Sequence, residues 1–419
     1  MRSRHIASLA IIFSCIASSV DAELRALPES LHIQPGEYTP VKWPGLEHAI
    51  EIYVPPEYSA DRSWPMIMNY HGTHEMPHAD VCRHLLGGKH FVLIGMEYNH
   101  RGPGIFSPEE GKKMVQNGLR TYRAVRKWIS SQLNIDQKRV YVSGLSKGGW
   151  HTSNLGDKDM VNIAGLIITM AGRHWSQTRA INESAFREKP IYIGVGEHDP
   201  NCPHAHYAKE YYRRCGARVS FEEFPGIGHQ LTTRSGLLKD WLEVEGALKS
   251  IPEQERAAQL SMWLKDKLDA ITEAQVANDQ LKQYYLLQLL RNNPKMHMCS
   301  PAELKKVSVI WDKLLSDSKE VSAEFKAQQM FTKNLQKEVL WLDSSSRSLA
   351  NLKKVHKAYH NTAHAHPETR YVLLAEGSRK RVAKTIASAE QSIQEAREEA
   401  KRRREESRSR MMPPTIRYK

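Results

Sequence analysis

A serine between two glycines stands in a pattern that could supply a nucleophile. Residues 144–148 read Gly-Leu-Ser-Lys-Gly, which fits G-x-S-x-G around Ser146. An apolar, β-rich run at 140–142 precedes the pattern and a helix-compatible stretch follows it, which is the context that the pattern requires. A sharp strand-to-helix turn strains the serine backbone and pushes its hydroxyl out, and the flanking glycines leave room for the turn. We therefore predict Ser146 as a nucleophile.

A serine nucleophile needs a base, and the base needs a carboxylate to orient it. Downstream of Ser146, a strand-like run ends in a loop with two acids, Glu197 and Asp199. A later strand-like run leads into a glycine-rich loop that carries His229. Each residue thus follows the carboxyl end of a strand, where open α/β sheets place their sites. We expect His229 to be the base, with one of the two acids as its partner.

The oxyanion that forms during acyl transfer needs two backbone N–H donors. One is expected from Lys147, the residue after the nucleophile. The other is expected from the loop after the strand-like run at 66–70, which reads His-Gly-Thr. Gly72 lets the backbone approach a substrate closely, so either Thr73 or Gly72 is the second donor.

The elements that must position these residues alternate along the chain. Short apolar runs bounded by turn residues predict strands at 50–54, 66–70, 91–96, 140–142, 163–170, 190–195 and 219–224. The clearest amphipathic stretch between them, 108–133, has helical spacing. The alternation predicts an α/β fold with a mostly parallel sheet flanked by helices. Candidate substrate-binding residues follow two of the strands: Tyr98, Asn99 and Trp175.

With these motifs in place, residues from about 48 to 245 resemble an α/β-hydrolase. The closest resemblance is to the secreted esterase branch that includes poly(3-hydroxybutyrate)-depolymerase-like, feruloyl-esterase-like and acetylxylan-esterase-like proteins. It rests on the approach to the nucleophile at 133–146, on His71-Gly72, on the acid loop at 196–200 and on Gly228-His229. The resemblance implies Ser146 as nucleophile, His229 as base and Asp199, in preference to Glu197, as the acid. It implies a serine ester hydrolase that forms an acyl-enzyme on a small, sugar-linked or polymeric ester, and this chemistry needs no cofactor.

Lys147 departs from the family pattern, which often has a small or neutral residue at this position. Its backbone N–H still serves, but its ammonium adds a positive charge beside Ser146. That charge could favour an acidic substrate, or it could indicate a serine peptidase acting on short peptides. A third hypothesis is an inactive hydrolase domain that serves as an anchored binding protein.

Two histidine patterns have metal-ligand spacing, yet we expect no metal at either. Residues 74–78 read His-Glu-Met-Pro-His and match H-E-x-x-H, but Pro77 disfavours the helix that this zinc site requires. His356, His360 and His364 recur every four residues, which an exposed polar helix face also explains.

The N-terminus predicts export. Residues 1–22 combine a basic start, an apolar stretch at 6–16 and small residues up to Ala22, which is typical of a secretory signal peptide. We therefore expect a secreted or periplasmic protein. The alternative is a lipid anchor on Cys15. Export leaves Cys82, Cys202, Cys215 and Cys299 with three ways of pairing. A Cys202–Cys215 disulfide is unfavourable because a helix is expected between them.

The 419 residues divide by composition into a near-neutral front and a basic back. With 40% hydrophobic and 26% charged residues, wholesale disorder is excluded. We expect the hydrolase domain at 23–248, a helical region at 249–380 and a charged helix or disordered basic tail at 381–419. Residues 249–419 carry +11 of the net charge of +13, which suggests contact with an anionic surface or polymer. No nucleic acid is expected, since basic and aromatic residues do not alternate there.

Overall fold

The computed structural model describes residues 32–98, 108–173, 180, 182–230, 235–342 and 348–411. The expected signal peptide at 1–22 lies outside this part of the chain, as do Asn99, Trp175 and the residues after 411. The chain forms two compact units, one at 1–317 and one at 318–419.

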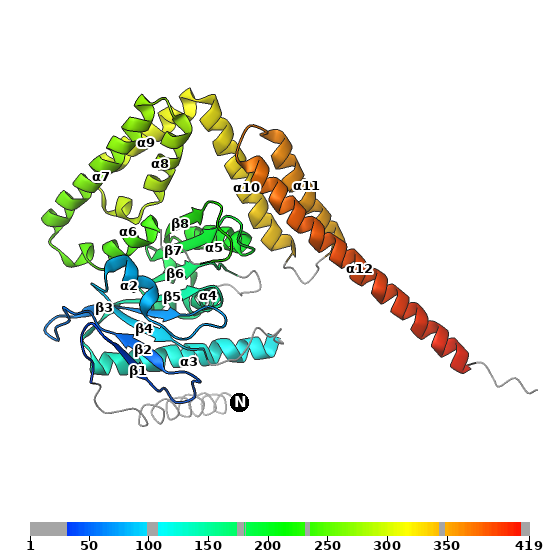
Figure 1. The fold of residues 1–419 in the computed structure, drawn as a ribbon, viewed down its shortest axis with the longest axis horizontal. Coiled ribbons are helices and arrows are strands. Elements are labelled where there is room, and N and C mark those ends of the chain that lie inside the picture. The colour runs from blue at the N-terminus through cyan, green and yellow to red at the C-terminus, as the bar shows by residue number, and fades with distance from the viewer. Residues whose placement is uncertain are drawn as a thin grey trace, which may run out of the picture. The chain divides into compact units, whose positions relative to one another are not determined.

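The first unit is built on one eight-stranded sheet, ordered β1-β2-β4-β3-β5-β6-β7-β8 from the bottom to the top of Figure 1. The strands β1 and β2 and the pair β2 and β4 are antiparallel, and the remaining pairs are parallel. The predicted mostly parallel sheet is confirmed. The strands are β1 (Tyr38–Val41), β2 (Ile50–Tyr53), β3 (Trp64–Tyr70), β4 (Val92–Met96), β5 (Ile135–Leu145), β6 (Gly165–Thr169), β7 (Pro190–Gly196) and β8 (Arg218–Phe224).

The parallel register brings the carboxyl ends of β3, β5, β6, β7 and β8 to one edge of the sheet. Tyr70 at the end of β3 pairs with Gly144 in β5, and Leu145 pairs with Thr169 at the end of β6. The last residue of β7, Gly196, pairs with the last residue of β8. The loops after β3, β5, β7 and β8 therefore leave the sheet together, which is where the sequence placed its candidate site.

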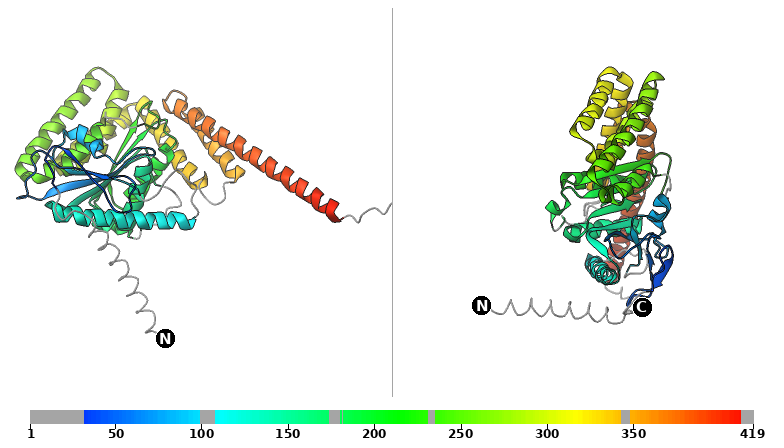
Figure 2. Two further views of the ribbon diagram at one scale, coloured as in Figure 1. Left: turned by 60° about the horizontal axis from the view of Figure 1, so that its bottom comes forward. Right: turned by 90° about the vertical axis from the view of Figure 1, so that its left-hand side faces the viewer.

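Helices cover both faces of this sheet. One face packs on α6 (Gly236–Glu245) and α2 (Asp80–Leu86); the other packs on α4 (Lys147–Asp159) and α5 (Cys202–Arg214). The long helix α3 (Pro108–Gln132) lies alongside α4 and runs along the sheet in the left view of Figure 2. Because side chains alternate along a strand, every second residue reaches α6. The core on that face includes Ile67, Leu93, Tyr141, Ile167, Tyr192, Leu238, Trp241 and Leu242.

Three more helices complete the first unit: α7 (Glu253–Val276), α8 (Gln280–Asn292) and α9 (Pro301–Asp317). Their buried apolar side chains include Leu260, Leu264, Leu268, Ile271, Tyr284, Val307, Trp311 and Leu314. Lys295, just after α8, lies 2.6 Å from Asp240 and 2.7 Å from Glu243 on α6, so ion pairs join this helical region to the part that contains the sheet.

The second unit contains α10 (Lys319–Leu342), α11 (Leu349–Ala365) and α12 (Tyr371–Met411). Its core joins the three helices through Tyr359, whose hydroxyl donates to Glu338 at 2.6 Å, and through buried Leu374 and Val382. The charged segment from 381 is helical as far as Met411. Among the described helices, none is long and apolar enough to cross a membrane.

Candidate active site

Ser146 forms the turn between β5 and α4. Its φ of 54° and ψ of −113° lie in a region that side-chain-bearing residues rarely adopt. The turn is tight because β5 passes directly into α4, and it leaves no space for a side chain on either flanking glycine. A Cβ at Gly144 would lie 2.2 Å from the Gly148 carbonyl oxygen, and one at Gly148 would lie 2.1 Å from the Tyr70 carbonyl oxygen. Both glycines of the motif are therefore required by the close approach of backbone.

The serine, the histidine and one acid come together at the carboxyl edge of the sheet. Ser146 Oγ lies 2.8 Å from His229 Nε2, and His229 Nδ1 lies 2.9 Å from Asp199 Oδ2. For Nε2 to accept the serine proton, Nδ1 must carry the other proton and donate it to Asp199. The remaining carboxylate oxygen of Asp199 accepts the Asn201 N–H at 2.7 Å.

Burial distinguishes the two members of the His–acid pair. The Asp199 side chain is fully buried, whereas that of His229 is 39% exposed. Burial raises the pKa of Asp199, against the opposing hydrogen bonds from Asn201 and His229. The other acid that the sequence left open, Glu197, accepts the N–H of Gly226 at 3.0 Å and so holds the loop that leads to the histidine.

The predicted oxyanion donors lie on α4 and on the segment after β3. Lys147 is the first residue of α4, where backbone N–H groups have no partner within the helix and the helix dipole favours negative charge. In the segment after β3, the Gly72 N–H donates to Glu75 Oε2 at 2.7 Å. Because that donor is occupied, Thr73 is the better candidate of the two in this segment.

A buried carboxylate, Glu97, contacts the segment after β3 through His71. Its Oε1 lies 3.1 Å from His71 Nε2 and its Oε2 lies 2.5 Å from His48 Nδ1. The Tyr98 N–H also donates to Oε1, at 2.7 Å. Burial raises the pKa of Glu97, but these hydrogen bonds outweigh it and lower the pKa to about 2. Glu97 is thus a fixed negative charge that orients two histidines.

Neither Glu97 nor Glu75 was among the residues predicted from the sequence. The available signal was that Glu97 follows an apolar strand directly, at the same edge as the other site residues. Glu75 was considered only as part of the H-E-x-x-H pattern. In the structure it lies in a loop at 71–79, with His74 at φ 66°, so the two histidines of that pattern do not share a helix face.

Tyr98, predicted as a substrate contact, is 5% exposed. Its hydroxyl donates to the His71 carbonyl, and its ring lies 5.7 Å from that of Tyr70. Tyr98 thus supports the segment after β3, while its ring face meets the Lys147 ammonium 4.8 Å from the ring centroid. The other two predicted substrate contacts, Asn99 and Trp175, lie outside the described residues.

Metal-ligand geometry occurs once within the described ranges, at Cys202, His206 and Glu223, whose ligand atoms lie within 4.8 Å of one another. His206 Nε2 already lies 2.7 Å from Glu223 Oε2. The half-buried Lys209 ammonium, whose pKa desolvation lowers to about 8, interacts with Glu223 and Cys202. Since a cation already faces these groups, we assign no metal to them. Cys202 and Cys215 lie at opposite ends of α5 and form no disulfide.

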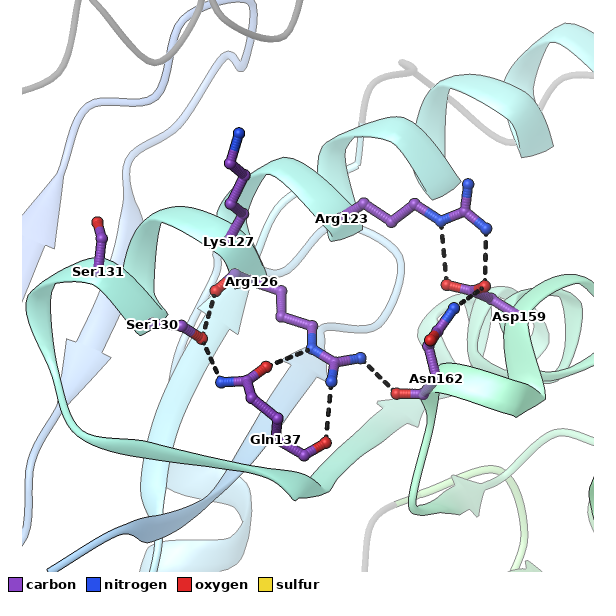
Figure 3. Close-up of a pocket in the computed structure, with 8 residues that line it drawn as sticks. All are labelled: Arg123, Arg126, Lys127, Ser130, Ser131, Gln137, Asp159 and Asn162. Carbon is purple, nitrogen blue, oxygen red and sulfur yellow. Dashed lines mark hydrogen bonds and ion pairs between the residues drawn. The ribbon is translucent and has the colours of Figure 1, made fainter. Parts of the chain in front are cut away.

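A surface pocket of about 420 Å³ lies away from the serine, at the amino end of β5 (Figure 3). The Arg123 guanidinium binds Asp159 at 2.7 and 3.1 Å, and Arg126 donates to Gln137 at 3.0 Å. These contacts satisfy the two guanidinium groups within the pocket wall. The lining residues are Arg123, Arg126, Lys127, Ser130, Ser131, Gln137, Asp159 and Asn162.

Solved structures with a similar fold include several esterases. A ferulic acid esterase from the anaerobic fungi Anaeromyces mucronatus aligns at 14% identity over 50% of this chain and 89% of that enzyme, with a TM-score of 0.36. A phospholipase/carboxylesterase from Dyadobacter fermentans aligns at 18% identity over 44% of this chain and 90% of that protein, with a TM-score of 0.35. A Bacillus cereus carboxylesterase aligns at 18% identity over 43% and 89%, with a TM-score of 0.36.

The sequence itself matches no protein-family model and no curated protein. A structural likeness at this level of identity and TM-score carries no argument about activity or substrate. We therefore infer the chemistry from the geometry around Ser146 in this chain.

Proposed function

We propose that the protein is a serine ester hydrolase in which Ser146, His229 and Asp199 act as a catalytic triad. The observation that carries this proposal is the hydrogen-bonded series of Ser146, His229 and Asp199 at the turn between β5 and α4. The serine hydroxyl lies 2.8 Å from the histidine, and the histidine lies 2.9 Å from a buried carboxylate. A strained serine with an exposed hydroxyl beside such a pair is the arrangement that activates a weak nucleophile.

In the proposed reaction, Ser146 Oγ attacks the ester carbonyl carbon while His229 Nε2 takes the hydroxyl proton. Asp199 keeps Nδ1 protonated and stabilises the imidazolium that forms. The N–H groups of Lys147 and Thr73 stabilise the oxyanion. His229 then returns its proton to the leaving alcohol, which leaves an acyl-enzyme. Water activated by the same histidine attacks the acyl-enzyme, and this step releases the acid and restores the serine.

The proposed substrates are small, sugar-linked or polymeric carboxylic esters. The proposed location is outside the cytoplasm, and this part of the proposal depends on the signal-like composition of residues 1–22. The mature protein would begin near residue 23.

Hydrolysis of 4-nitrophenyl acetate by the mature protein tests the proposal, with Ser146→Ala and Ser153→Ala measured beside it. Ser153 lies on α4, the helix that follows Ser146, and its hydroxyl lies 2.7 Å from that of Tyr212 in the core. Ser153→Ala therefore controls for the loss of a nearby serine hydroxyl. We expect turnover in the wild type and in Ser153→Ala, and a loss of at least about 1,000-fold in Ser146→Ala. Equal rates in wild type and Ser146→Ala would refute the proposal.

A serine peptidase is the second candidate, favoured by the Lys147 ammonium beside the nucleophile. Cleavage of an aminoacyl 4-nitroanilide separates the two functions. An amide would be cleaved by the same triad, but its amine is a poorer leaving group than the alcohol of an ester. A kcat/KM for the anilide that equals or exceeds that for a matched aminoacyl ester would favour the peptidase. Ester hydrolysis without any Ser146-dependent cleavage of the anilide would favour the esterase.

We also propose that the basic α12 attaches the protein to an anionic surface or polymer. Its basic side chains are concentrated at 401–404, where Lys401, Arg402, Arg403 and Arg404 are consecutive and exposed, and Arg403 also pairs with Glu399 one turn earlier. The full-length protein should sediment with an acidic polysaccharide at low salt and be released as salt rises. Equal retention on a neutral polysaccharide would contradict this role.

A further inference from the structure

Lys147 directly follows the proposed nucleophile, and its ammonium has no carboxylate partner among the described residues. Within the part of the chain that the structure describes, no carboxylate oxygen lies within 4.0 Å of Lys147 Nζ. The ammonium instead lies over the ring of Tyr98, 4.8 Å from the ring centroid. An ammonium on an aromatic face can still donate hydrogen bonds, because the ring does not accept its N–H groups as a carboxylate would.

The carboxylate that acts on this ammonium already has hydrogen-bond partners. Glu97, whose charge acts on Lys147, is held by two histidines and by the Tyr98 N–H. The Lys147 side chain is half-buried, and burial lowers the pKa of its ammonium against an opposing effect of Glu97. A partly desolvated cation without a counter-ion is unfavourable, and an anionic group on a bound molecule would relieve this cost.

The position of this charge relates it to the scissile bond. The backbone N–H of Lys147 is the proposed oxyanion donor, so its Cα lies beside the reacting carbonyl. The four-carbon stem of lysine keeps Nζ within about 6 Å of Cα. A carboxylate that meets Nζ therefore belongs a few bonds from the ester carbonyl and not at the far end of a long substrate.

We propose that this site selects esters that carry a carboxylate a few bonds from the scissile carbonyl, and that Lys147 is the residue that pairs with it. The inference rests on the proposed ester-hydrolase function and names its substrate class. The carboxylate can belong to the acyl group, as in a half-ester of a dicarboxylic acid, or to the alcohol, as in an ester of a hydroxy acid. Both sources present the same anion to the same ammonium.

Matched substrate pairs test the proposal and distinguish the two sources. On the acyl side, monoethyl succinate is compared with ethyl pentanoate, which has a similar length and no charge. On the alcohol side, acetoxyacetate is compared with propyl acetate, which has a similar length and no charge. The kcat/KM ratio of the charged to the neutral member is measured for wild type, Lys147→Met and Lys147→Arg. Each variant keeps the backbone N–H at 147, so the ratio within one variant isolates the side-chain charge.

We expect the wild type to prefer the charged member of one pair by about 10- to 100-fold, the range for a hydrogen bond between charged groups. Lys147→Met should abolish this preference, Lys147→Arg should retain part of it, and added salt should weaken it. A wild-type ratio near one in both pairs overturns the proposal, as does a preference that survives in Lys147→Met. If Ser146-dependent hydrolysis of 4-nitrophenyl acetate persists in either case, only this inference fails and the ester-hydrolase function stands.

Discussion

Gly148→Ala places one methyl group where α4 meets the end of β3. The new Cβ would lie 2.1 Å from the Tyr70 carbonyl oxygen and 2.7 Å from that of His71. Both oxygens are backbone atoms, so no side chain can rotate away. A Cβ rarely comes closer than about 3.0 Å to such an atom, and reaching that distance requires a relative movement of about 0.9 Å between α4 and β3.

This movement would occur between the two proposed oxyanion donors. Lys147 precedes the substituted residue on α4, and Thr73 follows the displaced end of β3. A misplacement of about 1 Å costs on the order of 100-fold in rate. The strained contact should also lower the free energy of unfolding by about 1–3 kcal/mol, which leaves a folded protein. We therefore expect kcat to fall about 100-fold, with a smaller change in KM.

The assay is steady-state hydrolysis of 4-nitrophenyl acetate, with urea unfolding of the same preparations. Gly236→Ala is the matched control, because a Cβ there meets nothing within 4 Å and the residue is the first of α6. It should leave both kcat and stability near the wild-type values. A folded Gly148→Ala protein whose kcat is within threefold of wild type would refute the claim that this close approach positions the two donors.

Three further predictions follow from the described contacts. Asp199→Asn should lower kcat for an aryl ester by about 1,000- to 10,000-fold with little change in fold, and Glu197→Gln should change it less than about tenfold, because only Asp199 binds His229 Nδ1. The Glu97 carboxylate, with its pKa lowered to about 2, should contribute about 3 kcal/mol of stability at neutral pH. The difference in unfolding free energy between wild type and Glu97→Gln should therefore shrink as the pH falls from about 4.5 to about 2, and a constant difference would contradict this. Gly377→Ala, at an open position within α12, should raise the thermal midpoint of the second unit by removing a helix-weakening glycine worth about 1 kcal/mol.

The sequence predicted the elements that have a strong local signal. The buried strands are short apolar runs, and the turn around Ser146 needs glycines that are visible in the sequence. The strand β1 was not predicted, because Tyr38–Val41 is short, contains Pro40 and pairs with only one neighbour at the edge of the sheet. The strand β5 begins five residues before the predicted 140–142, since its first half is polar and partly exposed.

The contacts between distant segments could not be obtained in this way. Glu197 and Asp199 lie only two positions apart in the loop after β7. Which of them contacts His229 therefore depends on how that loop folds. The Gly72 N–H is occupied because the chain turns, so that the Glu75 carboxylate, three residues later, accepts its hydrogen bond. The network around Glu97 joins residues from three separate loops, and no periodicity in the sequence marks such a contact.

Reaction of the mature protein with a fluorophosphonate tests the nucleophile most directly, because the reagent bonds covalently to an activated serine and bypasses the choice of ester. The account predicts one adduct per chain by intact mass, located on the peptide that contains Ser146, with none in Ser146→Ala and slower formation in Asp199→Asn. An adduct that persists in Ser146→Ala, or a folded wild type that forms none, would contradict it.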